Sequence, residues 1–332
     1  MHPYPLALEP ILKEKVWGGR RLETIGKSLP ENASVGESWE LADLQSTSPD
    51  GGGGDSARTI IANGPMRGLS VHDAIIAMGP NLLGNTKLTE SGCFPLLVKY
   101  LDAKESLSVQ VHPSPDYAAA HAEAHLKTES WYIVAAEPGS KLYKGVKPGV
   151  GRDEFAERIA NGTVEDVLIA IDAVAGELHH LPSGVCHALG AGVLVAEVQT
   201  PSDTTFRVFD WGRTDRTLHI EQALQCIDFD GALAQDAVTS DGTERCRLLE
   251  TEFYVLTEAR YFGNTQTNVR VGTGARVIMV LSGEGRIESE SGAFEPVALS
   301  TGRTILIPDA MEPARGFFTR DTVVLEARIP SE

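Results

Sequence analysis

The chain has 332 residues, of which 42% are hydrophobic and 23% are charged, and its formal net charge is −17. This length and composition are typical of a soluble globular protein with two domain cores. The negative charge argues against nucleic acid as a partner. The sequence contains no apolar run of about 18 residues, so it predicts no membrane-spanning helix. Four scattered cysteines form no Cys-x-x-Cys pair, so we expect a reducing, cytoplasmic location.

Short runs rich in β-branched and aliphatic residues, separated by glycine and proline, recur along the chain. Examples are PLLVKYL, WYIVAAE, VLVAEVQ, RVIMVLSG and TILIPD. This pattern predicts many short strands, and therefore a mainly β sandwich or barrel. Apolar residues spaced at i, i+3 and i+4 predict helical insertions at about 70–80, 114–125, 152–171 and 219–227. Ser114 followed by Pro115 fits an N-cap with proline at the first helical position.

Two segments with the same glycine-to-proline spacing indicate an internal repeat. Residues 176–187 read Gly-x5-Pro-x-Gly-x2-His, and residues 302–313 read Gly-x5-Pro-x-Ala-x2-Pro, so a proline stands where the first copy has His187. We interpret this as two copies of one β-barrel unit. Residues 1–230 would form a catalytic domain with the helical insertions, and residues 231–332 a degenerate domain without metal ligands. The alternative is that strand–turn–strand segments resemble one another by chance.

Gln110, His112, Glu129 and His187 lie far apart in the chain but together have the composition of a divalent-metal site. Two neutral imidazoles and a carboxylate suit Zn²⁺ or a similar ion, and the amide oxygen is a possible fourth ligand, directly or through water. Gln110 and His112 are two residues apart, so on a strand they face the same side. An open position on such an ion polarises a substrate oxygen, which predicts an enzyme.

The Gly-x5-Pro-x-Gly-x2-His spacing resembles the second motif of the cupin superfamily. Further segments resemble, in order, the short bacterial form of type I mannose-6-phosphate isomerase: WGGRRL, PLLVKYLDAKESLSVQVHP, KTESWY, LPSGVCHALGAG and EVQTPSDTTFRVFDWGR. The resemblance covers most of residues 10–230 and is weaker over 250–332. It implies a mainly β double cupin with helical insertions. It also implies one zinc ion per chain, held by the four residues named above.

The same resemblance implies roles for residues outside the metal site. Arg207 matches the arginine assigned to catalysis in the family. Ser108 and Lys127 match positions where the family has substrate or phosphate contacts, and Lys99 matches another active-site lysine, so all three are expected to bind the substrate. Other assignments remain open, because Arg207 can instead pair with Asp203 or Asp210, and Lys127 can be an ordinary solvated lysine.

The function implied by the resemblance is the reversible conversion of mannose 6-phosphate to fructose 6-phosphate through an enediol, with a small phosphorylated sugar as the partner. One alternative is a cupin-type non-haem iron oxygenase, because two histidines and a carboxylate also bind Fe(II). A second alternative is a non-catalytic sugar-binding cupin. The residues do not identify the general base, which can be a water on the metal or a carboxylate behind the ligands. The physiological metal, the choice among sugars and the oligomeric state are also open.

Overall fold

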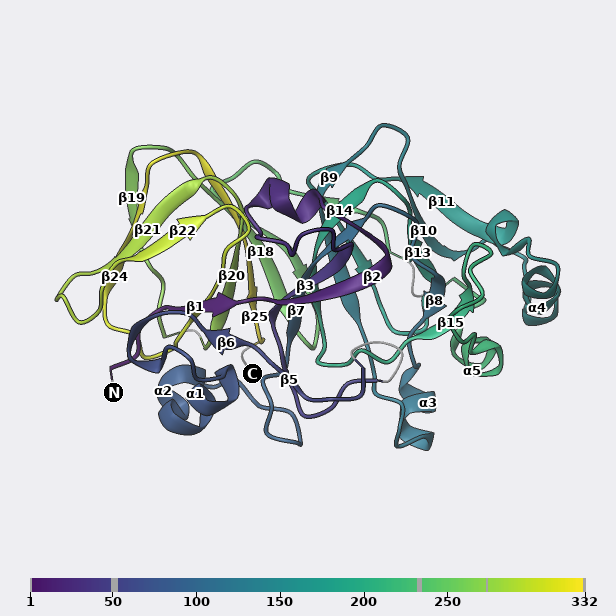
Figure 1. Cartoon of the computed structure of the whole chain (residues 1–332), viewed down its shortest axis with the longest axis horizontal. Coiled ribbons are helices and arrows are strands. Elements are labelled where there is room, and N and C mark those ends of the chain that lie inside the picture. The colour runs from purple at the N-terminus through teal and green to yellow at the C-terminus, as the bar shows by residue number, and fades with distance from the viewer. Residues whose placement is uncertain (1, 49–52, 232–234, 273, 331–332) are drawn as a thin grey trace.

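The computed structural model describes residues 2–48, 53–231, 235–272 and 274–330. Two β-barrels lie side by side, and short helices lie at the periphery (Figure 1). Each barrel has a seven-stranded sheet and a smaller sheet, with apolar side chains packed between them. The predicted mainly β, double cupin fold with helical insertions is therefore confirmed. Within the described residues, no helix is both long and apolar enough to cross a membrane.

The first barrel contains most of the residues before 231. Its seven-stranded sheet has the order β16 (Val238–Thr239), β12 (Glu177–Leu181), β9 (Glu129–Ala136), β14 (Val193–Gln199), β7 (Leu97–Ala103), β3 (Val35–Leu41) and β2 (Ile11–Gly19). Its five-stranded sheet has the order β11 (Leu168–Asp172), β10 (Lys141–Val146), β13 (His187–Leu189), β8 (Val109–Val111) and β15 (Phe206–Phe209). A separate two-stranded sheet pairs β4 (Asp43–Leu44) with β5 (Ala57–Arg58).

The second barrel combines the end of the chain with two strands from its beginning. Its larger sheet has the order β17 (Arg245–Glu250), β18 (Val255–Tyr261), β25 (Thr322–Arg328), β20 (Arg276–Ser282), β23 (Thr304–Ile307), β1 (Leu6–Glu9) and β6 (Ile60–Ile61). Its smaller sheet has the order β19 (Thr265–Asn268), β24 (Ala314–Phe318), β21 (Glu284–Ser289) and β22 (Val297–Ser300). Figure 1 shows the chain running from β1 in this sheet directly into β2 of the first barrel. The early segment therefore supplies strands to both barrels.

The two seven-stranded sheets pack back to back. One large apolar cluster contains Tyr100 and Tyr132 from the first sheet together with Leu256 and Leu306 from the second. Polar contacts cross the same interface: the Tyr132 hydroxyl donates to Glu258 at 2.7 Å. Strands β7 and β14 are therefore buried on both faces, which explains why their sequences are mostly apolar and do not alternate with polar residues.

The helices are shorter than the sequence predicts. They are α1 (Val71–Met78), α2 (Pro80–Leu83), α3 (Pro115–Ala120), α4 (Arg152–Ala160) and α5 (Ile220–Cys226), with 3-10 turns η1 (Arg21–Ile25), η2 (Gly64–Met66) and η3 (Val164–Val167). Ser114 caps α3 by accepting from the Tyr117 N–H, and proline occupies the first turn, as predicted.

The prediction of a helix over residues 152–171 is wrong for the second half of that range. Helix α4 ends at Ala160, Gly162 adopts a φ of +69°, and Leu168–Asp172 forms strand β11. Glycine favours this left-handed conformation, so the chain leaves the helix there. The helix predicted over 114–125 likewise stops at Ala120.

Candidate metal centre

His112, Glu129 and His187 converge inside the first barrel. His112 directly follows β8, Glu129 begins β9 and His187 begins β13, so each lies at a strand end. Nε2 of His112 lies 3.2 Å from Oε2 of Glu129, and Nε2 of His187 lies 3.1 Å from Oε1 of the same carboxylate. All three side chains are fully buried, and their ligand atoms lie within 4.8 Å of one another.

Backbone carbonyls fix the orientation of both histidine rings. Nδ1 of His112 donates to the Thr204 carbonyl at 3.1 Å, and Nδ1 of His187 donates to the Val185 carbonyl at 2.8 Å. Because each Nδ1 carries the proton, each Nε2 presents a lone pair to Glu129. Burial, with a smaller effect from Lys127, lowers the pKa of His112 to about 3, so this imidazole is neutral near pH 7.

The unsatisfied atoms at this point fit a metal ion. Nε2 of His112 and Oε1 of Glu129 are buried and accept no hydrogen bond from any described residue, and Oε2 of Glu129 has an ion pair with Lys127 but no hydrogen bond among the described residues. Buried polar atoms without partners are costly, and a divalent cation is the partner that two imidazoles and a carboxylate suit. The donor set therefore fits zinc.

Gln110 and Lys127 complete the surroundings of the three side chains. The amide group of Gln110 lies 3.3 Å from Nε2 of His187, close enough to join the same centre. Nζ of Lys127 lies 2.8 Å from Oε2 of Glu129. Burial alone would raise the pKa of Glu129, but Lys127 and His112 outweigh it and hold that pKa well below its usual range.

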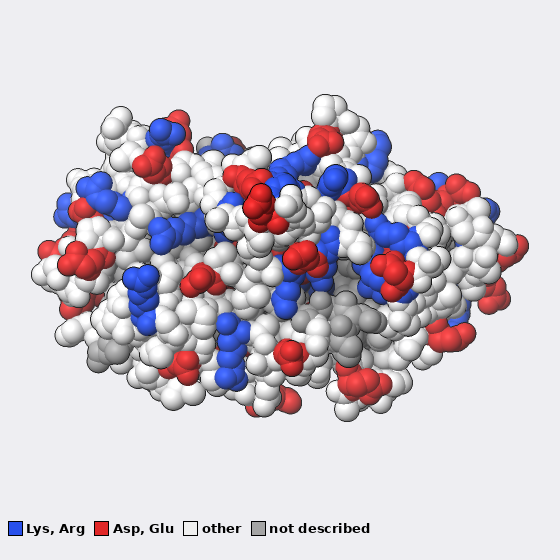
Figure 2. Space-filling model, in the orientation of Figure 1, with Lys and Arg blue, Asp and Glu red and all other residues white. Residues whose placement is uncertain are grey.

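A cavity of about 80 Å³ adjoins this centre and contains most of the other residues singled out in the sequence. Arg207 lies on β15, where Nε donates to the Ser108 hydroxyl at 3.3 Å and Nη1 to the Thr217 carbonyl at 2.7 Å. The cationic side chains that line the cavity are Lys15, Lys99, Lys127, Arg207 and Arg216. On the face shown in Figure 2, Lys and Arg side chains gather over the first barrel, although the molecule is acidic overall.

Asp210 and Asp203, considered in the sequence as partners of Arg207, have other contacts. Asp210 accepts from Arg213 at 2.7 Å and is also engaged by Arg216. Asp203 accepts from the backbone N–H of Ser48 at 2.8 Å.

Two carboxylates that line the cavity, Glu37 and Glu197, were not predicted from the sequence as site residues. Nζ of Lys99 lies 3.2 Å from Oε1 of Glu197 and 3.7 Å from Oε2 of Glu37. The indole N–H of Trp131 donates to the other oxygen of Glu197 at 2.8 Å. The available signal was a glutamate within the apolar run VLVAEVQ, because a carboxylate on a buried strand needs a specific partner.

These two carboxylates differ in electrostatic environment. Burial, followed by the charge of Glu129, raises the pKa of Glu197. Burial would also raise the pKa of Glu37, but Lys15 and Lys99 outweigh it and lower that pKa to about 2. Burial lowers the pKa of Lys99, yet Glu197 and Glu37 together raise it above its usual range. Lys99 is therefore a buried cation held between two acids.

Comparison with known proteins shows what the chain is similar to. Residues 6–138 match the family model for the catalytic domain of type I phosphomannose isomerase. A mannose-6-phosphate isomerase from Streptococcus mutans is 33% identical over 316 residues, which cover 93% of each chain. A crystal structure of the Bacillus subtilis mannose 6-phosphate isomerase has a TM-score of 0.84 at 27% identity, covering 98% of this chain and 99% of that one.

A more distant structure shares the fold alone. It is a mannose 6-phosphate isomerase bound with zinc and yttrium, with a TM-score of 0.74 at 15% identity, covering 98% of this chain and 100% of that one. The sequence relative, by contrast, exceeds 30% identity over nearly the full length of both proteins. The chain belongs to the type I mannose-6-phosphate isomerase family.

Proposed function

We propose that the cavity beside His112, Glu129 and His187 is the place where the reaction of the family, the interconversion of mannose 6-phosphate and fructose 6-phosphate, takes place. The observation that carries this proposal is the buried convergence of the three side chains, whose ligand atoms lie within 4.8 Å of one another. These three residues, with the amide of Gln110, would hold one zinc ion. When bound, zinc supplies a Lewis acid that polarises the sugar oxygens and stabilises negative charge on the enediol.

Arg207 is proposed as the catalytic cation. Its guanidinium is held by the Ser108 hydroxyl and the Thr217 carbonyl, so its position is fixed before a substrate enters. A fixed cation stabilises the charge that develops on an oxygen during isomerisation without reorganisation. Ser108 would both orient Arg207 and donate to the substrate.

Lys127 and Lys99 are proposed as substrate-binding residues at different positions. Lys127 contacts Glu129, so it would bind sugar oxygens near the metal ligands rather than a phosphate at the far end of the cavity. Lys99 lines the same cavity, where Glu37 and Glu197 already balance its charge. Its ammonium group would donate to a sugar hydroxyl while it orients the two carboxylates.

Glu197 is our candidate for the group that moves the proton between the two carbons. An efficient general base has a pKa closer to the working pH than an ordinary carboxylate has. Burial raises the pKa of Glu197, whereas that of Glu37 falls to about 2. Glu129 is less suitable, because its oxygens face the two metal-binding histidines.

Domain organisation and location remain proposals. We propose that residues 1–230 form the catalytic domain and residues 231–332 a duplicated domain without metal ligands, although β1 and β6 pair in the second sheet. All four cysteines are unpaired, which suits a reducing cytoplasm. The net charge of −17 disfavours nucleic acid as a partner.

One assay tests the function against both alternatives. Conversion of mannose 6-phosphate, coupled to detection of fructose 6-phosphate, should be lost on chelation and restored by zinc. Metal analysis of the purified protein should find about one zinc per chain. Bound iron with oxygen consumption would favour the oxygenase, and sugar binding without turnover would favour a non-catalytic protein.

A further inference from the structure

The second barrel has a basic residue where the first has a metal ligand. In the first sheet, Glu129 pairs with Leu181, the residue before the proline of the repeated glycine–proline spacing. In the second sheet, Arg276 pairs with Ile307, which also directly precedes that proline. The strands on the other side of these two residues give the same alignment. Glu129 pairs with Gln199 on β14, and Arg276 pairs with Arg328 on β25. Arg276 is therefore the structural equivalent of Glu129.

A second carboxylate of the first barrel is also replaced by an arginine, and its position is found from a carboxylate that both barrels keep. Two residues before Gln199 and Arg328 stand Glu197 and Glu326, which are equivalent and retain a carboxylate. Counting from these two across β7 to β3 and across β18 to β17 reaches Trp39 and Arg247. Two residues earlier on those strands, Glu37 is therefore equivalent to Arg245. At the positions of Glu129 and Glu37, the second barrel therefore has the guanidinium groups of Arg276 and Arg245, while the position of Glu197 keeps a carboxylate.

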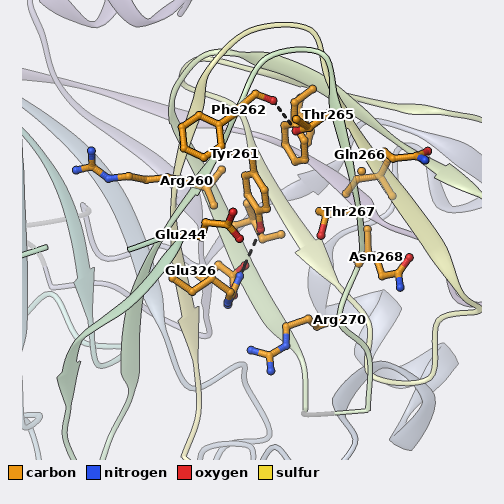
Figure 3. A pocket seen from close by; sticks show the side chains of 18 of the residues that line it. Glu244, Arg260, Tyr261, Phe262, Thr265, Gln266, Thr267, Asn268, Arg270 and Glu326 are labelled. Atoms are coloured by element: carbon orange, nitrogen blue, oxygen red, sulfur yellow. Dashed lines mark hydrogen bonds and ion pairs between the residues drawn. The ribbon is translucent and has the colours of Figure 1, made fainter. Parts of the chain in front are cut away.

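These arginines surround open space rather than a packed core. A cavity of about 500 Å³ lies inside the second barrel, and Arg245, Arg270 and Arg276 line it together with Glu326 (Figure 3). The same four residues line an adjoining cavity of about 530 Å³. Five arginines and two carboxylates line the adjoining cavity, so its charge is positive in a protein whose net charge is −17.

One carboxylate cannot neutralise the arginines around it. Glu326 accepts from Arg245 at 2.9 and 2.6 Å, and its Oε2 lies 3.3 Å from Nη1 of Arg276, which is 4% exposed. Arg270 makes no hydrogen bond or ion pair through its guanidinium with any described residue. In Figure 3 its side chain reaches toward the side of the cavity where Glu326 lies.

Away from these charged residues, the cavity of about 500 Å³ in the second barrel has an apolar wall that suits an organic group. The rings of Tyr261 and Phe318 stack with centroids 4.1 Å apart, and both line the cavity. Ile278, Ile287 and Leu299 extend this apolar wall. A ligand that fits both parts carries a negative oxygen group at one end and a hydrophobic body at the other.

We propose that the second barrel binds a small organic oxyanion, with its phosphate or carboxylate among Arg245, Arg270 and Arg276 and its body against Tyr261 and Phe318. This site is separate from the metal centre, and the proposal does not depend on the isomerase reaction. A guanidinium group matches the planar spacing of carboxylate and phosphate oxygens, which makes arginine suited to this role.

Calorimetry on the zinc-loaded full chain tests the proposal, with phenyl phosphate, phenylacetate and inorganic phosphate as probes. Arg270→Glu should weaken binding of the preferred phenyl probe at least about 10-fold, because it replaces a guanidinium at the anion position with a carboxylate. The matched control Arg320→Glu makes the same charge change at a side chain in the second barrel that is 77% exposed, and binding should change less than about 2-fold. Turnover of mannose 6-phosphate should stay near the wild-type value in both variants. The tighter of the two phenyl probes identifies the head group.

A soaked crystal locates the probe directly. Electron density for the probe among Arg245, Arg270 and Arg276 would support the assignment. Equal affinity of wild type and Arg270→Glu, or density in the first barrel alone, would overturn it. Arg270 is exposed, so the substitution should not disturb folding, and an unchanged melting temperature checks this. Arg270→Gln offers a milder variant for the same comparison.

Discussion

The ammonium group of Lys127 lies 2.8 Å from Oε2 of Glu129, so the carboxylate of the proposed metal centre is paired with a cation two residues away. Among the groups that lower the pKa of Glu129, Lys127 contributes most. A carboxylate with a low pKa stays ionised at acidic pH, so protons compete poorly with zinc.

Lys127→Met should therefore make zinc binding more sensitive to acid. Loss of the cation raises the pKa of Glu129, so the pH at which half the zinc is released should rise by about one unit. Zinc content after dialysis against a chelator at a series of pH values measures this. Lys141→Met removes an exposed cation on β10 and should leave the midpoint unchanged. An identical midpoint for Lys127→Met would show that the ion pair does not control metal affinity.

His187→Ala and His112→Ala should each release zinc and abolish turnover. Removing groups that merely orient ligands already costs 10–100-fold in metal affinity, so loss of a ligand should cost more than about 100-fold. Zinc content, activity and circular dichroism together separate metal loss from unfolding. His125→Ala removes an exposed imidazole and serves as the control. A variant that keeps both zinc and activity would refute the ligand assignment.

Arg207→Gln should retain zinc but turn over slowly. Removal of a preorganised donor to a developing oxyanion typically lowers kcat by about 100- to 1,000-fold. KM should change much less if the arginine acts mainly in the transition state. Arg213→Gln, at a nearby arginine that pairs with Asp210, provides the comparison. Normal kcat in Arg207→Gln would reduce this residue to a structural role.

Glu197→Gln tests the proposed general base against the neighbouring carboxylate. The amide keeps an oxygen for the Trp131 N–H but accepts no proton, so kcat should fall by about 100-fold or more with zinc still bound. Exchange of the C2 hydrogen of mannose 6-phosphate with solvent should slow in parallel. The control Glu37→Gln should affect exchange less, and the opposite ranking of the two variants would assign the base to Glu37.

Buried histidines away from the metal predict how stability depends on pH. Burial, with a smaller effect of Lys144, lowers the pKa of His179 to about 4, whereas an unfolded histidine titrates near 6.5. Between these values the unfolded chain binds more protons, so the free energy of unfolding should fall as pH falls from about 6.5 to about 4. The full loss from one such group is at most about 3.4 kcal/mol.

Urea denaturation at a series of pH values measures this dependence. His179→Gln should flatten the slope over that window, since the neutral amide titrates in neither state. His125→Gln, at an exposed position, should reproduce the wild-type slope. A wild-type slope in His179→Gln would mean that other groups dominate the acid sensitivity.

The sequence predicts the strands and the metal-binding residues for different reasons. Continuous apolar runs such as VLVAEVQ identify buried strands because local hydrophobicity reports burial. His112, Glu129 and His187 stand out through side-chain chemistry and family resemblance, and the structure brings them together. A glutamate inside an apolar run marks Glu197 only as a buried carboxylate, and the importance of Glu37 and Glu197 depends on Lys99 across the sheet, which no local pattern shows.

Long-range pairing lies outside what a local pattern predicts. The spacing over residues 152–171 fits a helix throughout, yet Leu168–Asp172 pairs with β10 as a strand, so partner availability overrode local preference. The equivalence of Glu129 and Arg276 likewise requires the register of four pairs of strands. The glycine–proline repeat suggested two related barrels but not that arginines in the second stand where Glu129 and Glu37 stand in the first.

The placement of β1 also constrains assembly of the molecule. Leu6 pairs with Leu306, so an early strand completes a sheet built mostly from the end of the chain. During synthesis the edge of this strand stays unpaired until β23 has been made. Contacts between residues this distant in sequence also slow folding. Separating the barrels by cutting the chain near residue 231 would leave the edge of β23 unprotected, and such an edge promotes aggregation.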